Sequence, residues 1–355
     1  MKKILFIGGS LNQTKIAHAV ARHLARDYAC CFTPYYCDGL IELAAGAGLL
    51  DFTVIGGNAR AQTEAYLQAQ RLPVDYGGRQ HDYDLVVTTS DLLIQDNIRH
   101  KKIVLVQEGM TDRESLMFYL VKWLKIPRYL ASTATNGLSN AYEYFCVASA
   151  GYRDFFIKKG VQPDKLVVTG IPNFDDVAQF KQNDFPYKKF VLVATSDARE
   201  TFKFDNRKKF IRRCLRIADD RPLIFKLHPN ENVKRATREI KALAPQALVF
   251  ANGSIEPMIA NCDVLITQYS TVVYLGLALG KEVHSYFDIE TLKKMTPIQN
   301  GGASGRNIAA VCRRVLEGTA QPERSRPEQT PIHHTSRPTF HILRSISYLR
   351  GLTYA

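Results

Sequence analysis

Three short polar segments each follow an apolar run of the chain, and their residue types suit phosphate binding and proton transfer. His228 and Pro229 come after one run, Gln268 to Thr271 after a second, and Glu108 with Gly109 after a third. In a parallel α/β sheet, ligands bind beyond the carboxyl ends of the strands. If the three runs are strands, the three segments lie at ligand-binding ends, and we expect them to open into one cleft.

The segment at His228 joins an apolar run to a charged helical pattern that begins at Asn232. Unpaired backbone N–H groups and the positive end of the helix dipole favour an anion there. The imidazole of His228 adds a hydrogen bond or a charge, and Pro229 stiffens the turn. We interpret both residues as part of a donor-binding site. The alternative is a histidine that is hydrogen-bonded within its own loop.

Gln268, Ser270 and Thr271 stand at the start of a second, apolar helical pattern. A hydroxyl beside free helix N–H groups can bind a diphosphate or a phosphodiester, so we predict that these three residues also bind the donor. The alternative is that Ser270 or Thr271 only caps the helix, since serine and threonine are preferred at that position. Capping does not exclude ligand binding.

Glu108 offers a carboxylate at the expected end of a strand. Such a group can take a proton from an attacking hydroxyl as general base, and the neighbouring Gly109 lets a ligand approach closely. Asp112 is the nearest second carboxylate. The alternative role for Glu108 is to accept hydrogen bonds from backbone N–H groups of its own loop.

A glycine loop follows the first apolar run and precedes a helical pattern at 15–26. The order of strand, glycine loop and helix is typical of a backbone that approaches a bound group closely. We therefore consider this loop, together with two residues after Glu108, as a candidate acceptor or phosphate loop: Gly8, Gly9, Ser10, Gly109 and Asp112.

Apolar runs alternate with helical patterns along most of the chain, which predicts a parallel, doubly wound α/β fold. The expected strands are 2–7, 52–55, 85–89, 103–106, 145–148, 166–169, 190–194, 223–227, 247–250, 264–267 and 282–286, with second-half helices at 208–217, 232–243 and 271–279. A polar stretch at 180–187 separates the halves. We predict two tandem Rossmann-like domains, residues 1–182 and 188–320, with a ligand cleft between them.

The composition is that of a soluble globular protein, with 46% hydrophobic and 23% charged residues in a chain of 355. Neither a secretory signal nor an apolar run of transmembrane length stands out, so we expect a cytoplasmic protein. Seven cysteines without a CxxC pair or a Cys/His cluster predict reduced thiols and no metal site. The net charge of +13 favours a polyanionic partner: a phosphorylated substrate, an anionic membrane surface or nucleic acid.

The last segment, 321–355, begins as a linker rich in proline and arginine and ends in a short amphipathic pattern at 340–352. One interpretation is a basic amphipathic tail that binds the inner face of the cytoplasmic membrane. The other is a helix that packs on the body of the protein.

The order Glu108-Gly109, His228-Pro229 and Ser270-Thr271 across two Rossmann-like domains resembles the acidic, HP and Ser/Thr motifs of one enzyme group. That group is the GT-B glycosyltransferases that use CMP-activated sugars, such as sialyltransferases and capsular Kdo transferases. The segment 266–283 is also similar to that of CDP-glycerol glycerophosphotransferases, which share the fold and a comparable HP motif. The resemblance spans roughly residues 100–315.

The resemblance implies an inverting, metal-independent glycosyltransferase, or a related nucleotide-activated group transferase, of bacterial capsule, surface polysaccharide or lipopolysaccharide assembly. It implies that residues 1–182 bind the acceptor, that 188–320 bind the donor, and that Glu108 is the catalytic base. The donor is expected to be CMP- or CDP-linked, with UDP as the next option. The acceptor is expected to be a glycan or a lipid-linked hydroxyl, and no cofactor is needed.

Two other function classes stay open. The segment 146–176 resembles the end of the first domain in UDP-GlcNAc 2-epimerases, although that family carries an Arg-Pro-Glu element in its first loop, where this chain has Gly8-Gly9-Ser10. A basic nucleic-acid-binding protein is favoured by the net charge alone. The clustering of motifs at strand ends and the lack of a basic-aromatic single-strand pattern argue against it, and we expect no nucleic acid partner.

Overall fold

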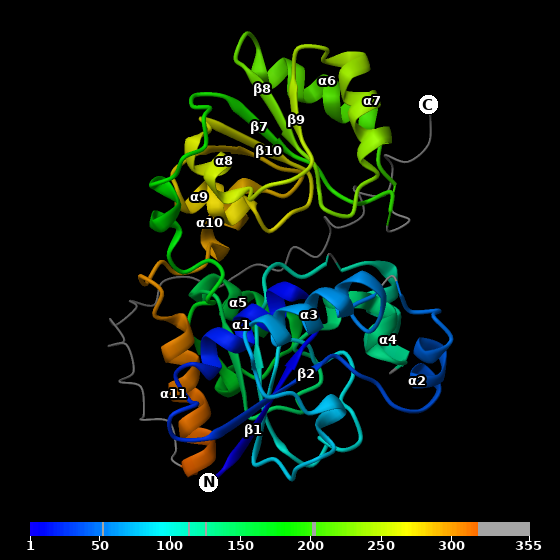
Figure 1. The fold of residues 1–355 in the computed structure, drawn as a ribbon, viewed down its shortest axis with the longest axis vertical. Coiled ribbons are helices and arrows are strands. Elements are labelled where there is room, and N and C mark those ends of the chain that lie inside the picture. The colour runs from blue at the N-terminus through cyan, green and yellow to red at the C-terminus, as the bar shows by residue number, and fades with distance from the viewer. Residues whose placement is uncertain (52, 113, 125, 201–203, 319–355) are drawn as a thin grey trace, which may run out of the picture. The chain divides into compact units, whose positions relative to one another are not determined.

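Two parallel sheets with helices packed beside them form the described part of the chain (Figure 1). The computed structural model describes residues 1–51, 53–112, 114–124, 126–200 and 204–318. The first sheet has six strands in the order β2-β1-β3-β4-β5-β6, and the second has five in the order β11-β10-β7-β8-β9. All their strand pairs are parallel, which confirms the predicted α/β architecture.

Buried strands account for most of the apolar runs. Strands covered on both faces read as continuous hydrophobic segments, so their positions could be predicted closely. Those of the first sheet are β1 Lys3–Gly8, β2 Ala29–Pro34, β3 Leu85–Thr88, β4 Lys102–Val106, β5 Tyr144–Val147 and β6 Leu166–Val168. Those of the second are β7 Val191–Ala194, β8 Leu223–Lys226, β9 Leu248–Phe250, β10 Val264–Thr267 and β11 Glu282–His284.

Helices connect the strands, and the first of them begins at a capping box. The Ser10 hydroxyl accepts from the Gln13 backbone N–H while the Gln13 side chain accepts from the Ser10 N–H, which fixes the start of α1. The α-helices are α1 Leu11–Ala21, α2 Gly39–Gly46, α3 Gly57–Ala69, α4 Leu116–Leu124, α5 Ala150–Lys159, α6 Arg207–Ala218, α7 Val233–Leu243, α8 Glu256–Asn261, α9 Val273–Ala278, α10 Ile289–Met295 and α11 Ser304–Glu317. Short 3₁₀ helices are η1 Tyr76–Gly78, η2 Arg128–Thr135, η3 Pro163–Lys165 and η4 Val177–Lys181.

The strand predicted at 52–55 is wrong. Phe52 lies outside the described residues, and Thr53 to Ile55 form bends and turns. The Thr53 hydroxyl donates to Leu50 O at 2.7 Å and accepts from Ile55 N at 3.2 Å, so local side-chain bonds replace the strand ladder. The edge of the sheet is instead β2, which pairs with β1 from Lys3 opposite Ala29 onward.

Helix α11 packs on the first sheet, although it follows the second sheet in sequence (Figure 1). Ile308, Cys312 and Val315 share a buried cluster with the strands and with α1. Gly305 permits the approach, because a Cβ there would lie 2.8 Å from Ala19 O. The division into residues 1–182 and 188–320 stays a prediction, with the added observation that the chain returns to the first sheet.

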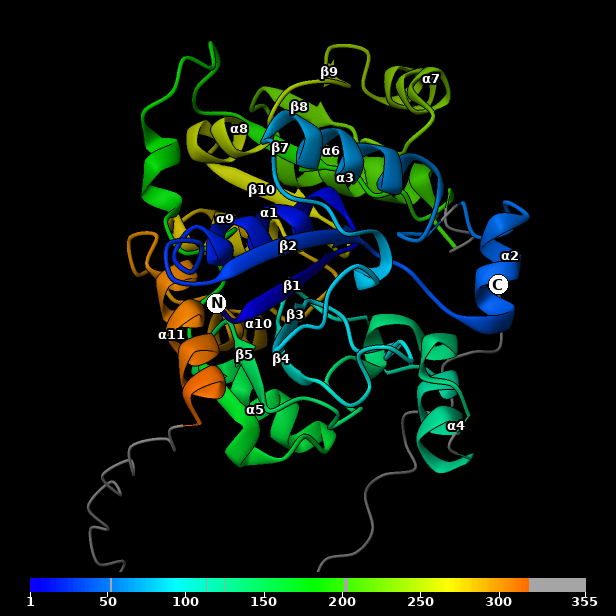
Figure 2. The ribbon, with the colours of Figure 1, turned by 60° about the horizontal axis from the view of Figure 1, so that its bottom comes forward.

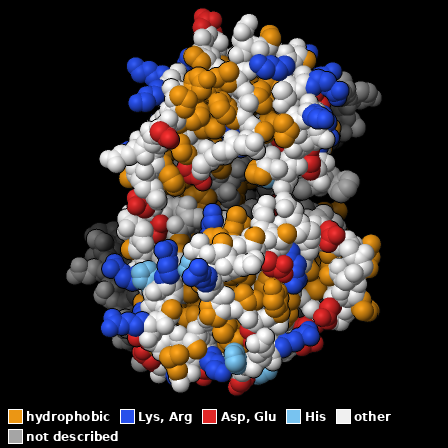
Figure 3. All heavy atoms as spheres, in the orientation of Figure 1, with side chains coloured by type: hydrophobic (Ala, Val, Ile, Leu, Met, Phe, Trp, Pro, Cys, Tyr) orange, Lys and Arg blue, Asp and Glu red, His pale blue; other side chains and the backbone are white. Residues whose placement is uncertain are grey.

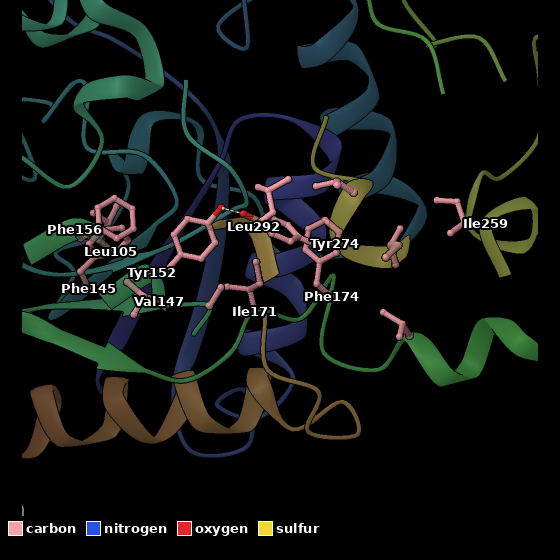
Figure 4. Close-up of a cluster of buried hydrophobic side chains, with 14 of the residues drawn as sticks. Leu105, Phe145, Val147, Tyr152, Phe156, Ile171, Phe174, Ile259, Tyr274 and Leu292 are labelled. Carbon is pink, nitrogen blue, oxygen red and sulfur yellow. Dashed lines mark hydrogen bonds between the residues drawn. The ribbon is translucent and has the colours of Figure 1, made fainter. Parts of the chain in front are cut away.

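One buried cluster includes side chains from both halves of the chain, and two tyrosines join them at its centre (Figure 4). Tyr152 of α5 and Tyr274 of α9 share a hydrogen bond of 2.6 Å between their hydroxyls. Burial raises the pKa of Tyr274 to about 12, so its hydroxyl stays protonated at physiological pH. This contact ties α9, which follows the predicted Ser270-Thr271 segment, to the first half.

Within the described residues, no helix has the length and apolar character needed to cross a membrane. The tail predicted at 321–355 lies outside these residues.

Candidate functional site

Loops at the carboxyl ends of β4, β7 and β10 line a pocket of about 480 Å³. Asp112 and Ser132 contribute from the first half of the chain, and Asp197, Ser270 and Thr271 from the second. This is the edge at which parallel sheets bind ligands. The structure therefore brings Asp112, Ser270 and Thr271 of the predicted site residues into one lining.

Glu108 is held by side chains from the start of α1. Its carboxylate accepts from the Ser10 hydroxyl at 3.1 Å, from the Asn12 amide at 3.2 Å and from the Gln13 amide at 2.6 Å. The predicted glycine loop and the predicted base thus lie side by side. Three donors fix the orientation of the carboxylate, and all three are side chains of another element rather than backbone N–H groups of its own loop.

Gly8 and Gly9 are buried and serve the packing of this loop. A Cβ at Gly8 would lie 2.4 Å from the Thr14 hydroxyl oxygen, and one at Gly9 would lie 2.0 Å from the Gln13 side chain. Both glycines therefore let the loop fold against α1. Ser10 is the member of the loop that contacts Glu108.

Gly109 lies directly against the loop after β10. A Cβ added to Gly109 would be 3.0 Å from Cγ2 of Thr271, so the absence of a side chain allows the two loops to meet. This contact places the loop that carries Glu108 beside the Ser270-Thr271 segment. Glu108 itself does not belong to the pocket lining, but Met110, two residues on, does.

Ser270 and Thr271 do not cap α9 through their side chains. The N-cap residue is Val272, and α9 has no side-chain cap bond. The Ser270 hydroxyl accepts only a long bond, 3.4 Å, from the Val272 N–H. Both residues line the pocket, and their predicted contact with a donor stays a prediction.

His228 stands beside the pocket rather than in its lining. Its Nδ1 lies 3.6 Å from a carboxylate oxygen of Asp197, which does line the pocket, and accepts from the Asn230 N–H at 3.3 Å. The side chain is 37% exposed, and Pro229 is exposed as well. Helix α7 begins at Val233, behind an Asn232 cap, so the helix start lies several residues beyond the histidine.

Lys226, the basic residue before His228, is turned inward. Its ammonium donates to Leu227 O at 3.1 Å and to Ala251 O at 3.0 Å. Burial lowers the pKa of Lys226 from its ordinary value. This lysine therefore supports the strand end, and we assign it no contact with a ligand.

A buried network of ion pairs and hydrogen bonds connects the loops that follow β7, β8 and β10. Arg207 donates to Asp205 at 2.9 Å and to Glu231 at 2.5 Å, and Glu231 accepts from the His228 backbone N–H at 3.0 Å. Gln268 donates to Asp205 at 2.9 Å and accepts from the Ser196 hydroxyl at 3.0 Å. The side-chain amide of Gln268 thus links the loop after β10 to the loop after β7, and its predicted contact with the donor stays a prediction.

Sequence reasoning did not single out Ser132, Ser196 and Asp197. The signal for the last two was present, since Thr195-Ser196-Asp197 follows the apolar run of β7 just as the other polar segments follow theirs. Ser132 carries no such signal. Its backbone φ is +53°, an uncommon value that a serine adopts in the bend of η2, and its hydroxyl donates to Asp112 at 2.7 Å.

Among the described residues there is no group of three or more His, Cys, Asp or Glu side chains able to hold a metal ion. The two carboxylates of the pocket lining, Asp112 and Asp197, come from opposite halves of the chain. Oxygen acceptors of this kind suit the hydroxyl groups of a ribose or a sugar. The pocket therefore combines hydroxyl donors with carboxylate acceptors.

No protein-family model matches the chain, and no curated protein matches it significantly. Solved structures do match. A co-structure of S. aureus MnaA with UDP has a TM-score of 0.54 and 14% identity, over 91% of this chain and 99% of that one. A UDP-GlcNAc 2-epimerase from Neisseria meningitidis bound to UDP-GlcNAc has a TM-score of 0.50 and 12% identity, over 89% and 100%. The wall teichoic acid polymerase TagF matches with a TM-score of 0.47 and 11% identity, over 89% of each chain.

At 12–14% identity, the first two similarities show a shared fold. They extend over nearly the whole of each chain. Together with the two parallel sheets, they confirm the prediction of two tandem Rossmann-like domains in the GT-B architecture.

Proposed function

We propose that the chain is a nucleotide-sugar-dependent glycosyltransferase, or a related transferase of a nucleotide-activated group. The donor occupies the pocket at Asp197, Ser270 and Thr271, and Glu108 activates the acceptor. The observation that carries this proposal is the contact between Gly109 and Thr271, which sets a fixed carboxylate loop against a hydroxyl-bearing loop. A base and a donor site on adjoining loops are what transfer to a hydroxyl requires.

The reaction proceeds by inversion and needs few groups from the protein. The acceptor hydroxyl attacks the anomeric carbon as Glu108 takes its proton, and the bond from that carbon to the phosphate oxygen breaks. The nucleotide leaves with the bonding electrons, and the hydroxyls of Ser270 and Thr271 stabilise its phosphate. The carboxylate of Asp197 accepts hydrogen bonds from ribose or sugar hydroxyls.

Three features support Glu108 as the base. The carboxylate of Glu108 is oriented by Ser10, Asn12 and Gln13. Glu108 is half-buried, and the next residue, Gly109, contacts Thr271. Orientation in advance lowers the entropic cost of reaching the transition state. Ser10 and its glycine loop then shape the acceptor side of the site.

The proposed donor is CMP- or CDP-linked, with UDP as the next option, and the proposed acceptor is a glycan or a lipid-linked hydroxyl. The setting is bacterial capsule, surface polysaccharide or lipopolysaccharide assembly on the cytoplasmic side of the membrane. These assignments rest on the motif order Glu108-Gly109, His228-Pro229 and Ser270-Thr271. The proposal includes no metal and no cofactor.

A second candidate is a nucleotide-sugar 2-epimerase. Matched structures include an epimerase bound to UDP-GlcNAc. Within this chain, Asp112 and Asp197 enter the pocket from opposite halves, an arrangement that suits removal of a proton on one side of a sugar and its return on the other. An epimerase works without an acceptor, and this difference separates the two candidates.

Product analysis tests the proposal. The protein is incubated with CMP-, CDP-, UDP- and GDP-linked sugars, with and without a mixture of glycan and lipid-linked acceptors, and NMR records the products. The transferase predicts release of the nucleotide that depends on the acceptor, with inverted configuration at the anomeric carbon. Conversion of UDP-GlcNAc without any acceptor would establish the epimerase instead.

His228→Ala is expected to raise the donor dissociation constant by about 10- to 150-fold, because a hydrogen bond to a charged group contributes about 1.5–3 kcal/mol. The contacts of His228 with Asn230 and Asp197 are long, so its side chain can turn to a phosphate. Calorimetric titration of the donor measures the change. His81→Ala, at an exposed histidine of the first half, is the matched control. Unchanged affinity in a folded His228→Ala protein would make this histidine a loop residue only.

A further inference from the structure

A second pocket, of about 710 Å³, shares no lining residue with the candidate donor pocket and is formed by the segment after β3, by α4, by η2 and by the end of α5. Much of its lining is aliphatic. Leu92, Leu93, Ile94, Val121, Ile126 and Leu138 contribute these surfaces. Such a lining suits a hydrocarbon chain.

Four cations also belong to this lining: Arg99, Lys122, Arg128 and Lys159. The described residues of the lining include neither Asp nor Glu. Arg99 pairs with Asp96 at 2.7 Å on the surface. Lys122 and Arg128 donate to neutral carbonyls, to Lys159 O at 3.2 Å and to Asp91 O at 2.6 Å. The positive charges of the pocket are therefore only partly neutralised within the described chain.

Lys159 is the most unusual of the four, because it is only 3% exposed and its ammonium has no hydrogen-bond acceptor among the described residues. The ammonium lies 5.7 Å from the ring centre of Phe118, 4.9 Å from that of Phe155 and 5.6 Å from that of Phe156. Aromatic faces compensate a buried cation only in part. Because the Nζ atom is closed to solvent, its charge acts on the pocket from behind the lining.

Exposed apolar side chains occur on α4, which contributes to the pocket, and on α2. Leu116, Trp123 and Leu124 of α4 are 76%, 73% and 65% exposed, and Figure 2 shows α4 at the edge of the ribbon, away from both sheets. Leu40 and Leu43 of α2 are 84% and 70% exposed, and hydrophobic side chains lie among polar ones at the right-hand edge of Figure 3, where Figure 1 places that helix. Exposed tryptophan and leucine beside cations are typical of a surface that meets lipid.

We propose that this pocket binds the anionic head and the first chain carbons of a phosphate-bearing lipid. Lys122 and Arg128 meet the phosphate, the buried charge of Lys159 adds to the attraction, and the aliphatic lining holds the chain. Charge complementarity favours a lipid whose phosphate head has a net negative charge over a zwitterionic one, and the apolar lining favours a lipid over free phosphate. This inference does not depend on the proposed transferase activity, because it concerns a different pocket.

Calorimetric titration of the full-length protein tests the inference with three soluble probes. These are dihexanoyl phosphatidic acid, dihexanoyl phosphatidylcholine and inorganic phosphate. The phosphatidic acid is expected to bind at least about 10-fold more tightly than the phosphatidylcholine, since one hydrogen bond to a charged group corresponds to that factor. It is expected to exceed inorganic phosphate by at least about 10-fold as well, because burial of a few chain carbons contributes that much. Equal binding of the two lipids, or of inorganic phosphate and phosphatidic acid, would contradict the inference.

Charge-removing variants locate the site. Lys122→Gln with Arg128→Gln is expected to weaken phosphatidic acid binding by about 10-fold or more. The matched control is Lys234→Gln with Arg238→Gln, which removes two exposed charges from α7. An equal loss in both double variants would show attraction by net charge alone and would overturn the assignment. Circular dichroism confirms that each variant is folded.

Lys159→Met is expected to change the pH dependence of stability. Burial lowers the pKa of Lys159 from 10.5 to about 8, while Glu114, Asp91 and Asp112 oppose the shift and Lys122 adds to it. Between these values the unfolded chain binds a proton that the native chain does not, so wild-type stability rises from pH 8 toward 10.5. The Tm of the wild type relative to Lys159→Met should therefore be higher at pH 9.5 than at pH 7.5. A constant difference would mean that the buried lysine does not titrate in this range.

Discussion

Glu108→Gln is expected to lower the single-turnover rate of transfer by about 10²- to 10⁴-fold, which is the usual contribution of positioned proton transfer. The change removes basicity and keeps shape. The introduced amide can present its oxygen to the Gln13 amide and its NH₂ group to the Ser10 hydroxyl, while the Asn12 amide turns its own oxygen toward that NH₂ group, so the loop stays in place. Because the base acts only as the acceptor attacks, donor affinity should stay nearly unchanged.

Two further variants make this result specific. Glu143→Gln changes an exposed glutamate next to the opposite end of the same sheet and should leave the rate unaltered. Asp112→Asn removes the second carboxylate of the Glu108 loop, which lines the pocket and accepts from Ser132. If Asp112→Asn lost the rate and Glu108→Gln kept it, the role of base would pass to Asp112. Loss of donor binding in Glu108→Gln would assign Glu108 to donor recognition.

Arg207→Met is expected to lower the free energy of unfolding by about 3–5 kcal/mol, because removal of one partner of a buried ion pair leaves the other charge uncompensated. Arg207 is 4% exposed and pairs with both Asp205 and Glu231. Glu231 would stay buried without its cation, and Asp205 would keep the longer ion pair with Arg199 at 3.7 Å. Methionine has a similar length and keeps much of the packing, so the loss reports on charge rather than on a cavity.

Chemical denaturation measures this change, and Arg212→Met is the matched control. Arg212 is an exposed arginine of the same helix and should change stability by less than about 0.5 kcal/mol. The network also holds the His228 backbone N–H and the Gln268 side chain, so donor affinity should fall together with stability. A stable Arg207→Met protein with normal donor affinity would show that the loops hold their positions without the network.

The alternation of apolar runs and helical patterns along the sequence was enough to predict most of the fold. Each strand of the second sheet lies within a predicted apolar run. Strands β7 and β10 are buried at every position, which requires an apolar run, whereas the edge strands β9 and β11 are only partly buried. Strand β2 was missed, since its sequence Ala29 to Pro34 contains two cysteines, a threonine and a proline rather than a run of large aliphatic residues. Strand order could not be predicted, because it depends on contacts between distant segments.

Contacts between distant segments also explain why the partners of the site residues could not be predicted. Glu108 was singled out by its place after β4, but its donors come from the start of α1, and β3 lies between β1 and β4 in the sheet. The role of Gln268 depends on Asp205 and Ser196, two residues from other loops. Local spacing indicates which residues stand at strand ends, whereas only the assembled sheets determine which of them line the pocket.

Donor binding to the pocket is the most direct test of the account. The wild type and the double variant Ser270→Ala with Thr271→Val are titrated calorimetrically with CMP, CDP, UDP and GDP, and Ser254→Ala with Thr296→Val, at two sites outside the pocket lining, serves as the control. The account predicts that CMP, CDP or UDP binds the wild type and the control equally, and that the loss of two hydrogen bonds to phosphate weakens binding to the pocket variant by at least about 10-fold. Binding of no nucleotide to the wild type, or equal binding to all three proteins, would contradict it.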